Sequence, residues 1–186
     1  MTPDDVEPDT KDWTWVLDSP CPECGFDASS VRPTDVAEHV LRNAAAWPAR
    51  LAGPGVGARP RTGTWSVLEY GCHVRDIHRI FRQRVRLMLD EDEPRFPNWD
   101  QDETALADDY ASQRPGTVAA ELVAAADAVA DTYAAVPDGA WSRRGLRSNG
   151  SEFTVASIAV YHLHDVVHHA WDVDPDRDSG KQEQPG

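Results

Sequence analysis

The sequence lacks a hydrophobic run long enough to span a bilayer, and it has only three cysteines among 186 residues. A membrane helix needs about 20 consecutive apolar residues. The N-terminus also lacks the charged segment followed by an apolar segment that marks a secreted chain. Three cysteines, an odd number, do not make a disulfide framework. These absences predict a cytoplasmic protein that does not insert into membranes.

Several catalytic signatures are missing as well. The chain has no Gly-x-Ser-x-Gly element, no phosphate-binding glycine loop and no dinucleotide fingerprint. Positive charge is scarce, because 18 Lys and Arg face 32 Asp and Glu, for a net charge of −14. This charge argues against nucleic acid or an anionic membrane as a partner. The partner that we expect is therefore a small-molecule substrate.

Apolar residues recur at helical spacing in four segments, with no alternating strand pattern between them. The expected helices run from Pro33 to about Pro48, from Val67 to about Asp90, from about Pro115 to before Pro137, and from Thr154 to about Val173. Ser66-x-x-Glu69 is a capping box that starts the second helix. The sequence therefore predicts an all-α four-helix bundle over 33–175. A non-helical N-terminal extension, 1–32, precedes it, and a disordered tail, 176–186, follows it.

Four of the seven histidines lie in the last predicted helix, at His162, His164, His168 and His169. His164 and His168 are four residues apart, which places their imidazoles one above the other on one helical face. His162 and His169 lie near the other margin, about 10 Å apart along the helix axis, too far apart to bind one ion together. Two further pairs share the spacing of four: Asp165 with His169, and His168 with Asp172.

A third ligand is expected from a facing helix. His73 falls within the apolar stripe of the second helix and should point inward. His78, near the edge of that stripe, and His39, on the first helix, are weaker candidates. Zinc in catalytic sites is held by three protein ligands that leave one position open. The helix angles therefore predict a metal site formed by His73, His164 and His168.

Cys21 and Cys24 form a Cys-x-x-Cys pair within the predicted extension. A structural zinc site needs four ligands, and Cys72 is the only other cysteine. The favoured interpretation is a tight turn that carries two thiols. A zinc site completed by other residues or by a second chain, and a redox pair, stay open as alternatives for this possible separate thiol site.

Two motifs, taken together, resemble a known family. The stretch Trp65-Ser66-Val67-Leu68-Glu69-Tyr70-x-Cys72-His73-Val74-x-Asp76 is followed, about 90 residues later, by His164-Asp165-x-x-His168-His169. Their order and separation resemble the DinB/YfiT-like superfamily, which includes the N-terminal domain of mycothiol-dependent maleylpyruvate isomerase. The resemblance extends from about Pro33 to Val173. It implies a four-helix bundle with one metal ligand on the second helix and two on the fourth, which map onto His73, His164 and His168.

The resemblance also implies a function. Members are often homodimers, and several transfer a low-molecular-weight thiol such as mycothiol. We therefore expect a divalent metal, namely zinc, nickel or iron, and a mycothiol-type thiol as cosubstrate, with the metal lowering the pKa of a bound thiol or water. Asp76, Asp165 and Trp171 are expected to orient the ligands, and Asn98 and Trp99 to line the mouth of the site. A non-catalytic, metal-stabilised bundle that acts as a binding or stress-response module, and a metal-dependent hydrolase, are the alternatives.

Overall fold

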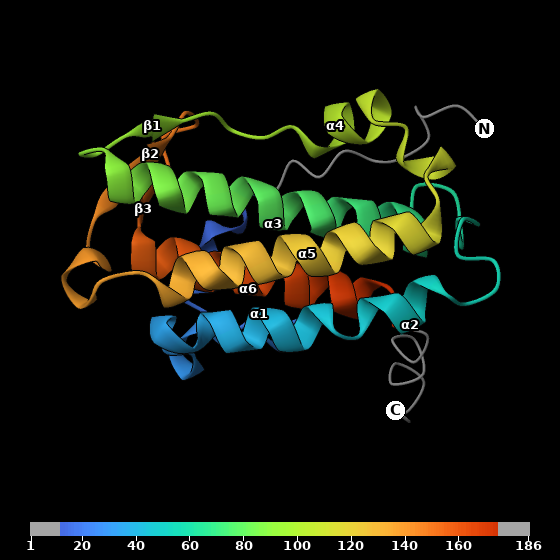
Figure 1. Cartoon of the computed structure of the whole chain (residues 1–186), viewed down its shortest axis with the longest axis horizontal. Coiled ribbons are helices and arrows are strands. Elements are labelled where there is room, and N and C mark those ends of the chain that lie inside the picture. The colour runs from blue at the N-terminus through green and yellow to red at the C-terminus, as the bar shows by residue number, and fades with distance from the viewer. Residues whose placement is uncertain (1–11, 175–186) are drawn as a thin grey trace, which may run out of the picture.

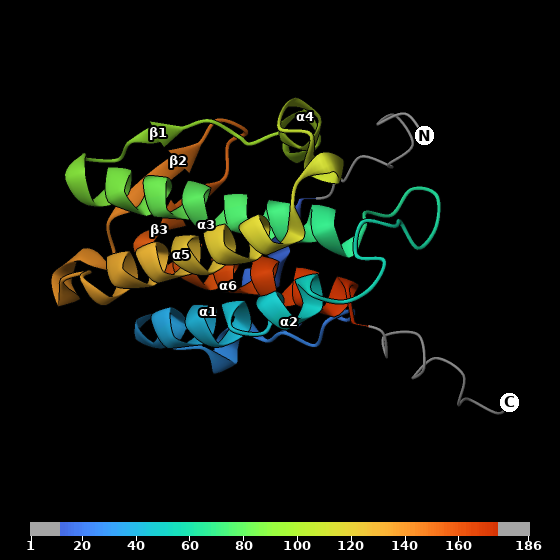
Figure 2. The ribbon, with the colours of Figure 1, turned by 45° about the vertical axis from the view of Figure 1, so that its right-hand side comes forward.

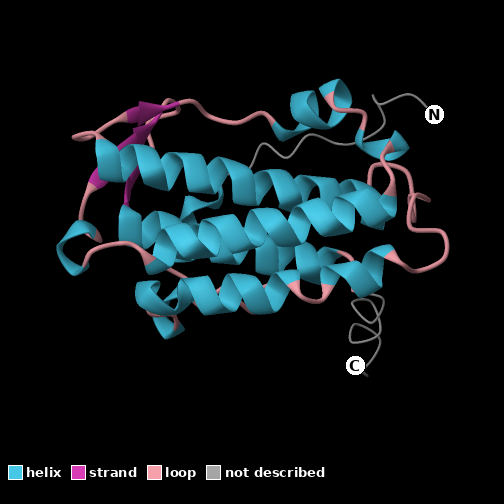
Figure 3. Ribbon diagram, viewed as in Figure 1, coloured by secondary structure: helices cyan, strands magenta, loops and turns pink. Residues whose placement is uncertain are grey.

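The computed structural model describes residues 12–174. The predicted tail, 176–186, and residues 1–11 of the predicted extension lie outside the described residues. The helices are α1 (Val36–Ala44), α2 (Trp47–Leu51), α3 (Val67–Asp90), α4 (Gln101–Ala107), α5 (Pro115–Ala134) and α6 (Val155–Asp172). The strands are β1 (Arg95–Phe96), β2 (Arg144–Arg147) and β3 (Glu152–Thr154). Helix dominates the described chain (Figure 3).

The long helices form a bundle in which each packs against two neighbours. α3 packs against α5 and α6, and α1 packs against the same two helices from the opposite side (Figure 1, Figure 2). The order around the bundle is therefore α1, α5, α3, α6. This confirms the predicted four-helix bundle, and it places α3 and α6 side by side, with the inward residues of each facing the other.

The helix starts follow from local sequence. The Ser66 hydroxyl accepts a hydrogen bond from the backbone N–H of Glu69 at 3.2 Å, and the Glu69 carboxylate accepts one from the N–H of Ser66 at 2.8 Å. Thr154 and Ser157 form the same reciprocal pair at the start of α6. Each such cap typically contributes about 1 kcal/mol to helix stability. Both helices that carry the histidines thus begin at defined residues.

A small three-stranded sheet at one end of the bundle was not predicted (Figure 1). β1 pairs with β2 in parallel, and β2 pairs with β3 as a hairpin. The strands have two to four residues, too few to show a period of two in the sequence. Gly145 is needed within β2, because a Cβ there would lie 2.8 Å from Cγ of Met88 and 2.9 Å from Cε1 of Phe96. The sheet thereby packs closely on the end of α3.

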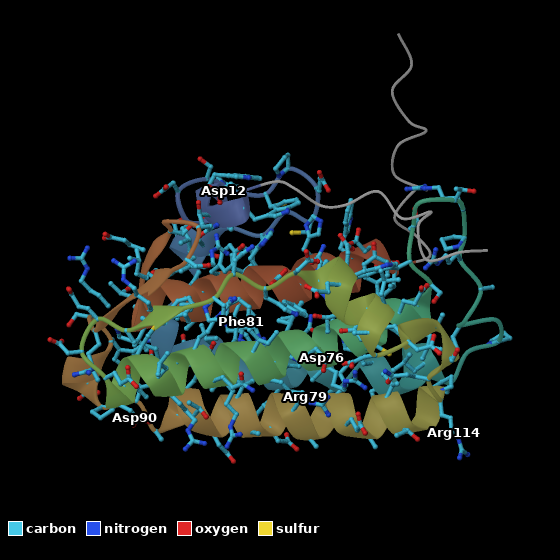
Figure 4. The ribbon with its side chains drawn as sticks, turned by 90° about the horizontal axis from the view of Figure 1, so that it is seen from above. Asp12, Asp76, Arg79, Phe81, Asp90 and Arg114 are labelled. Atoms are coloured by element: carbon cyan, nitrogen blue, oxygen red, sulfur yellow. The ribbon has the colours of Figure 1, made fainter. Side chains whose placement is uncertain are left out.

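The described part of the N-terminal extension covers α6. We call residues 12–35 the lead-in segment; it contains the short 3₁₀ helices Trp13–Leu17, Ala28–Ser30 and Pro33–Asp35, each in contact with α6. Figure 4 shows it, near the label of Asp12, along the side of α6 away from α3. α6 is therefore enclosed on several sides, and polar groups all around it are buried.

The core is a continuous set of buried apolar side chains from α1, α3, α5, α6 and the lead-in segment. Burial of apolar surface contributes roughly 25 cal/mol per Å² to folding. Polar side chains on the inner faces of the same helices are buried too, and each then needs a hydrogen-bond partner. Within residues 12–174, no helix combines the length and the apolar character that crossing a membrane requires.

Asp76 on α3 is a buried carboxylate at the centre of a polar network (Figure 4). Arg75 donates hydrogen bonds to it at 2.8 and 3.0 Å, Arg79 at 2.9 Å and the Tyr110 hydroxyl at 2.7 Å. Burial raises the pKa of Asp76, but the bonds from Arg75 and Tyr110 outweigh it and hold the pKa below its usual value. The apolar pattern predicts Arg75 on the outer face; it is instead buried, because Glu121 on α5 pairs with it at 3.0 Å.

Asp76→Asn is expected to lower the free energy of unfolding by about 3 kcal/mol near neutral pH, because it removes the buried counter-charge of Arg75 and leaves it only the half-exposed Glu121. The folded-state pKa of Asp76 lies below the unfolded value of 3.8. Its stabilisation is therefore present above that value and is lost as the pH falls through the folded-state pKa.

Urea unfolding should show the difference between wild type and variant shrinking from neutral pH to about pH 3. Glu152→Gln breaks an exposed pair with Arg144 and should change stability by less than about 1 kcal/mol. A difference of equal size at both pH values would contradict the assigned role of Asp76.

Candidate functional site

Two pairs of histidines meet across the interface between α3 and α6. Nε2 of His73 lies 3.1 Å from Nε2 of His169, and Nδ1 of His78 lies 3.0 Å from Nε2 of His162. Numbers rise along α3 as they fall along α6, so the two helices run antiparallel at this interface. The two pairs therefore lie one after the other along the interface between α3 and α6.

The pair of His78 and His162 is enclosed in the core. The Tyr133 hydroxyl lies 2.9 Å from Nδ1 of His162, and Phe81 stacks on the ring of His162 at 4.7 Å between centroids. Burial lowers the pKa of His162 to about 3 and that of His78 well below its usual value. If Tyr133 donates to Nδ1, neutral His162 carries its proton on Nε2 and donates it to Nδ1 of His78. The contact between His78 and His162 is therefore a hydrogen bond within the core.

The pair of His73 and His169 is flanked by two carboxylates. Nε2 of His169 lies 3.5 Å from Oδ1 of Asp165, and its Nδ1 lies 3.0 Å from Oδ2 of Asp172. Trp99 stacks on the His73 ring at 5.1 Å. We call His73, Asp165 and His169 the His–Asp cluster. Nε2 of His169 lies close to both other residues, but the donor atoms of all three do not lie within 4.8 Å of one another. Imidazole nitrogen and carboxylate oxygen are donors that divalent metals accept.

The electrostatics of the His–Asp cluster favour a cation. Burial lowers the pKa of His73 to about 3, so this imidazole is neutral. Burial also lowers the pKa of His169, but its bonds to Asp165 and Asp172 outweigh that effect and raise the pKa to about 9. Positive charge is thus held where His169 meets His73, and a divalent cation would satisfy the same carboxylates. Nδ1 of His73 is buried and has no hydrogen-bond partner among the described residues.

A second cluster lies on the other side of α6, under the lead-in segment. We call it the Cys/His cluster: Cys21, Cys24, His164 and His168. One donor atom from each lies within 4.8 Å of the others, and within residues 12–174 no other group of three or more His, Cys, Asp or Glu meets that condition. Sγ of Cys21 lies 3.7 Å from Nδ1 of His168. This donor set can hold a metal ion.

The structure therefore divides the predicted ligand set of His73, His164 and His168. It brings His164 and His168 together, as predicted, but joins them to the two cysteines. His73 is not in that cluster and meets His169. The physical reason is the rotation of α6 about its own axis. Asp165 and His169 face α3, and they point about 100° away from His164 and His168, the pair predicted to do so.

The other predicted site residues lie around both clusters. Trp171 packs against His168, with 5.4 Å between ring centroids. The backbone N–H of Asn98 donates to the Ser148 hydroxyl at 2.8 Å, which anchors the loop that carries Trp99 over His73. Asp76, expected to orient a ligand, is instead bound by the arginines and Tyr110 of its own network.

A pocket with a cavity volume of about 520 Å³ adjoins both clusters. Its aromatic lining comprises Trp13, Trp65, Tyr70, Phe81, Trp99 and Tyr161. Its polar lining includes Arg84, Asn98, Arg147, His164, Asp165, His168, His169 and Asp172. The pocket therefore gives a small molecule access to the His–Asp cluster, between aromatic rings.

Two arginines, Arg84 and Arg147, line the pocket, and Arg84 is one that the sequence pattern did not single out. Both are buried, at 8% exposure each. Arg84 donates to the carbonyl of Pro97 at 3.1 Å, and within residues 12–174 no carboxylate forms an ion pair with it. Burial and nearby Arg147 lower the pKa of Arg84 to about 10, which leaves it charged at neutral pH. Arg84 lies within the apolar stripe of α3, three residues after Phe81 and four before Met88, and this position distinguishes it in the sequence from the exposed Arg79 and Arg86.

Comparisons with known proteins agree with this architecture. The family model of the DinB superfamily matches residues 30–173. Among solved structures, the chain is similar to YfiT from Bacillus subtilis, described as a probable metal-dependent hydrolase with an unusual four-helix bundle topology. The TM-score is 0.60 at 19% identity, over 77% of this chain and 87% of that one, which shows a shared fold. No match was found among curated proteins.

His162→Ala is expected to lower the free energy of unfolding by about 3 kcal/mol, because it opens a cavity and leaves Tyr133 and His78 without a partner. The metal content of the purified protein should not change, since both ring nitrogens of His162 face core residues. Chemical unfolding and elemental analysis check the two results. Loss of metal with unchanged stability would contradict the assignment of His162 to the core.

Proposed function

Because the chain belongs to the DinB superfamily, we propose that it is a metal-dependent enzyme that transfers a low-molecular-weight thiol, such as mycothiol, to an anionic electrophile. The proposed catalytic cation is divalent and is held by the His–Asp cluster. The observation that supports this most directly is the meeting of Nε2 of His73 and Nε2 of His169 at 3.1 Å, beside Asp165, at the pocket.

The donor set fits a catalytic metal. Catalytic zinc sites commonly have three protein ligands, with nitrogen and carboxylate oxygen donors, and leave a position for substrate. The Asp172 carboxylate accepts a hydrogen bond from Nδ1 of His169, the contact by which a carboxylate fixes the orientation of a ligating imidazole. A bound divalent cation would lower the pKa of a thiol or water that coordinates to it.

The pocket residues supply binding and orientation. Trp65 and Trp99 enclose the His73 ring, at 5.0 and 5.1 Å between centroids, and keep water from its inner face. Arg84 and Arg147 present two buried guanidinium groups that bind carboxylates well. A substrate or thiol that carries a carboxylate would thus be held at the arginines, with its reactive end toward the His–Asp cluster.

Hydrolysis is the second candidate function. The same cluster would serve a water nucleophile, and YfiT, which shares the fold, is described as a probable metal-dependent hydrolase. Thiol transfer is favoured here by the cavity of about 520 Å³, which has room for two organic reactants; its lining carries Arg84 and Arg147 together with five aspartates. The two functions differ in whether an added thiol is consumed.

His73→Ala and His169→Ala are each expected to lose about one metal equivalent per chain and to lower turnover by at least about 100-fold, because a two-ligand remainder binds metal weakly. Elemental analysis and steady-state kinetics measure the two effects. His39→Ala, a histidine on α1 outside the pocket lining, is the matched control and should change neither.

A conjugation assay separates the two candidate functions. Metal-loaded protein is mixed with mycothiol and a carboxylate-bearing electrophile, and the conjugate is measured by mass spectrometry beside hydrolysis of a model ester. Metal-dependent conjugate formation supports the proposal. Ester hydrolysis without thiol consumption would favour the hydrolase. If neither reaction occurs and metal removal only lowers thermal stability, the metal is structural and the enzyme proposal fails.

Arg84→Gln is expected to lower kcat/KM for a carboxylate-bearing substrate by about 10- to 100-fold, mainly through a higher KM, because it removes a charged hydrogen bond made in both ground and transition states. Arg86→Gln, an exposed arginine on the same helix, is the control. With a substrate whose carboxylate is replaced by an amide, wild type and Arg84→Gln should have the same kcat/KM. An unchanged KM would contradict the role given to Arg84.

A further inference from the structure

We propose that the Cys/His cluster is a second metal site, a structural zinc centre that fastens the lead-in segment to α6. It is distinct from the catalytic site proposed above, and nothing in it depends on that function. Two sulfur and two nitrogen donors are the usual set for structural zinc. The four ligands come from two segments about 140 residues apart in the sequence, so one ion would crosslink them.

The spacing of the donors fits a tetrahedral ion. Zn–S and Zn–N bonds of about 2.3 and 2.0 Å place neighbouring donors about 3.3–3.8 Å apart. The distance from Sγ of Cys21 to Nδ1 of His168 is 3.7 Å, and all four donors lie within 4.8 Å of one another. A contraction of at most about 1.5 Å between donor atoms would therefore complete the shell.

The turn that carries the cysteines is shaped for this role. The N–H of Cys21 donates to the carbonyl of Phe26 at 2.8 Å, and the N–H of Gly25 donates to the carbonyl of Cys21 at 2.9 Å. Gly25 has φ of +73°, a conformation that glycine adopts without strain. These bonds close a tight loop that directs both thiols toward α6.

The two histidines are also held in place. His168 has Nδ1 toward Cys21, while its Nε2 lies 3.5 Å from Glu23 and 3.9 Å from Asp172. Carboxylates at the far nitrogen are the usual support for a ligating imidazole. Nε2 of His164 is buried and has no hydrogen-bond partner among the described residues. A buried polar nitrogen of this kind needs an explanation, and a metal-binding cluster provides one.

Four protein ligands leave no open position, so this centre is structural. A metal ion at this centre would also affect the pocket. Trp13, in the lead-in segment, packs on the rings of His164 and His168 at 5.7 and 4.9 Å and also lines the pocket. Zinc at the cluster would therefore hold one wall of the substrate pocket in place.

Cobalt substitution of the full-length protein tests this centre. Cobalt bound by thiolates gives an intense near-ultraviolet charge-transfer band, which imidazole and carboxylate ligands do not give. Wild type should show this band, and about one zinc equivalent per chain should be bound at the Cys/His cluster. Cys24→Ser should lose the band and about one equivalent. Cys72→Ser, at a cysteine buried on α3 away from the cluster, should keep both.

Limited proteolysis supplies the second readout. In Cys24→Ser, cleavage within the lead-in segment should become at least about tenfold faster, because local opening is no longer opposed by metal binding. Circular dichroism checks that the helices of the variant remain folded. His73→Ala should keep the charge-transfer band and the slow cleavage, which separates this proposal from the catalytic one.

Two results would overturn the proposal. One is a wild-type protein that binds cobalt without a thiolate band. The other is a folded Cys24→Ser variant with unchanged metal content and unchanged cleavage. A disulfide between Cys21 and Cys24 in protein purified under reducing conditions, found by mass spectrometry together with no zinc, would also contradict it.

Discussion

The need to satisfy buried imidazoles on α6 is the constraint on which the rest of the structure depends. His162, His164 and His168 are buried, with exposures of 7% or less, and a buried polar group without a partner costs about 1–3 kcal/mol. Each histidine of the helix therefore meets a specific surface. His162 meets α3 and α5 through hydrogen bonds, His169 meets His73, and the remaining two meet the cysteines of the lead-in segment.

The acidic chain also carries cationic groups inside. The net charge is −14, yet Arg75, Arg84 and Arg147 are buried. Arg75 neutralises Asp76 within the bundle, whereas Arg84 and Arg147 line the pocket. Two carboxylates flank the His–Asp cluster, and the pocket lining that carries Arg84 and Arg147 also holds five aspartates.

Much of the fold could be predicted from the sequence, because helix signals are local. Ser66 and Glu69 start α3 where the capping box predicted, and His73 points inward, as its position in the apolar stripe indicated. The site could be predicted only in part. α6 is enclosed on several sides, so its apolar pattern does not reveal which histidine pair faces α3. The partners of Cys21 and Cys24 are distant in the sequence, and a lead-in segment of short 3₁₀ helices and turns has no periodicity that reveals what it packs against.

Under the two proposals above, α6 serves two separate metal sites from two of its faces. Anomalous diffraction at the zinc edge, on crystals of the zinc-loaded protein, tests this most directly. The account predicts two peaks, one among Cys21, Cys24, His164 and His168, and one between His73 and His169 beside Asp165. A single peak shared by His73, His164 and His168 would contradict it, and so would the absence of zinc at both clusters.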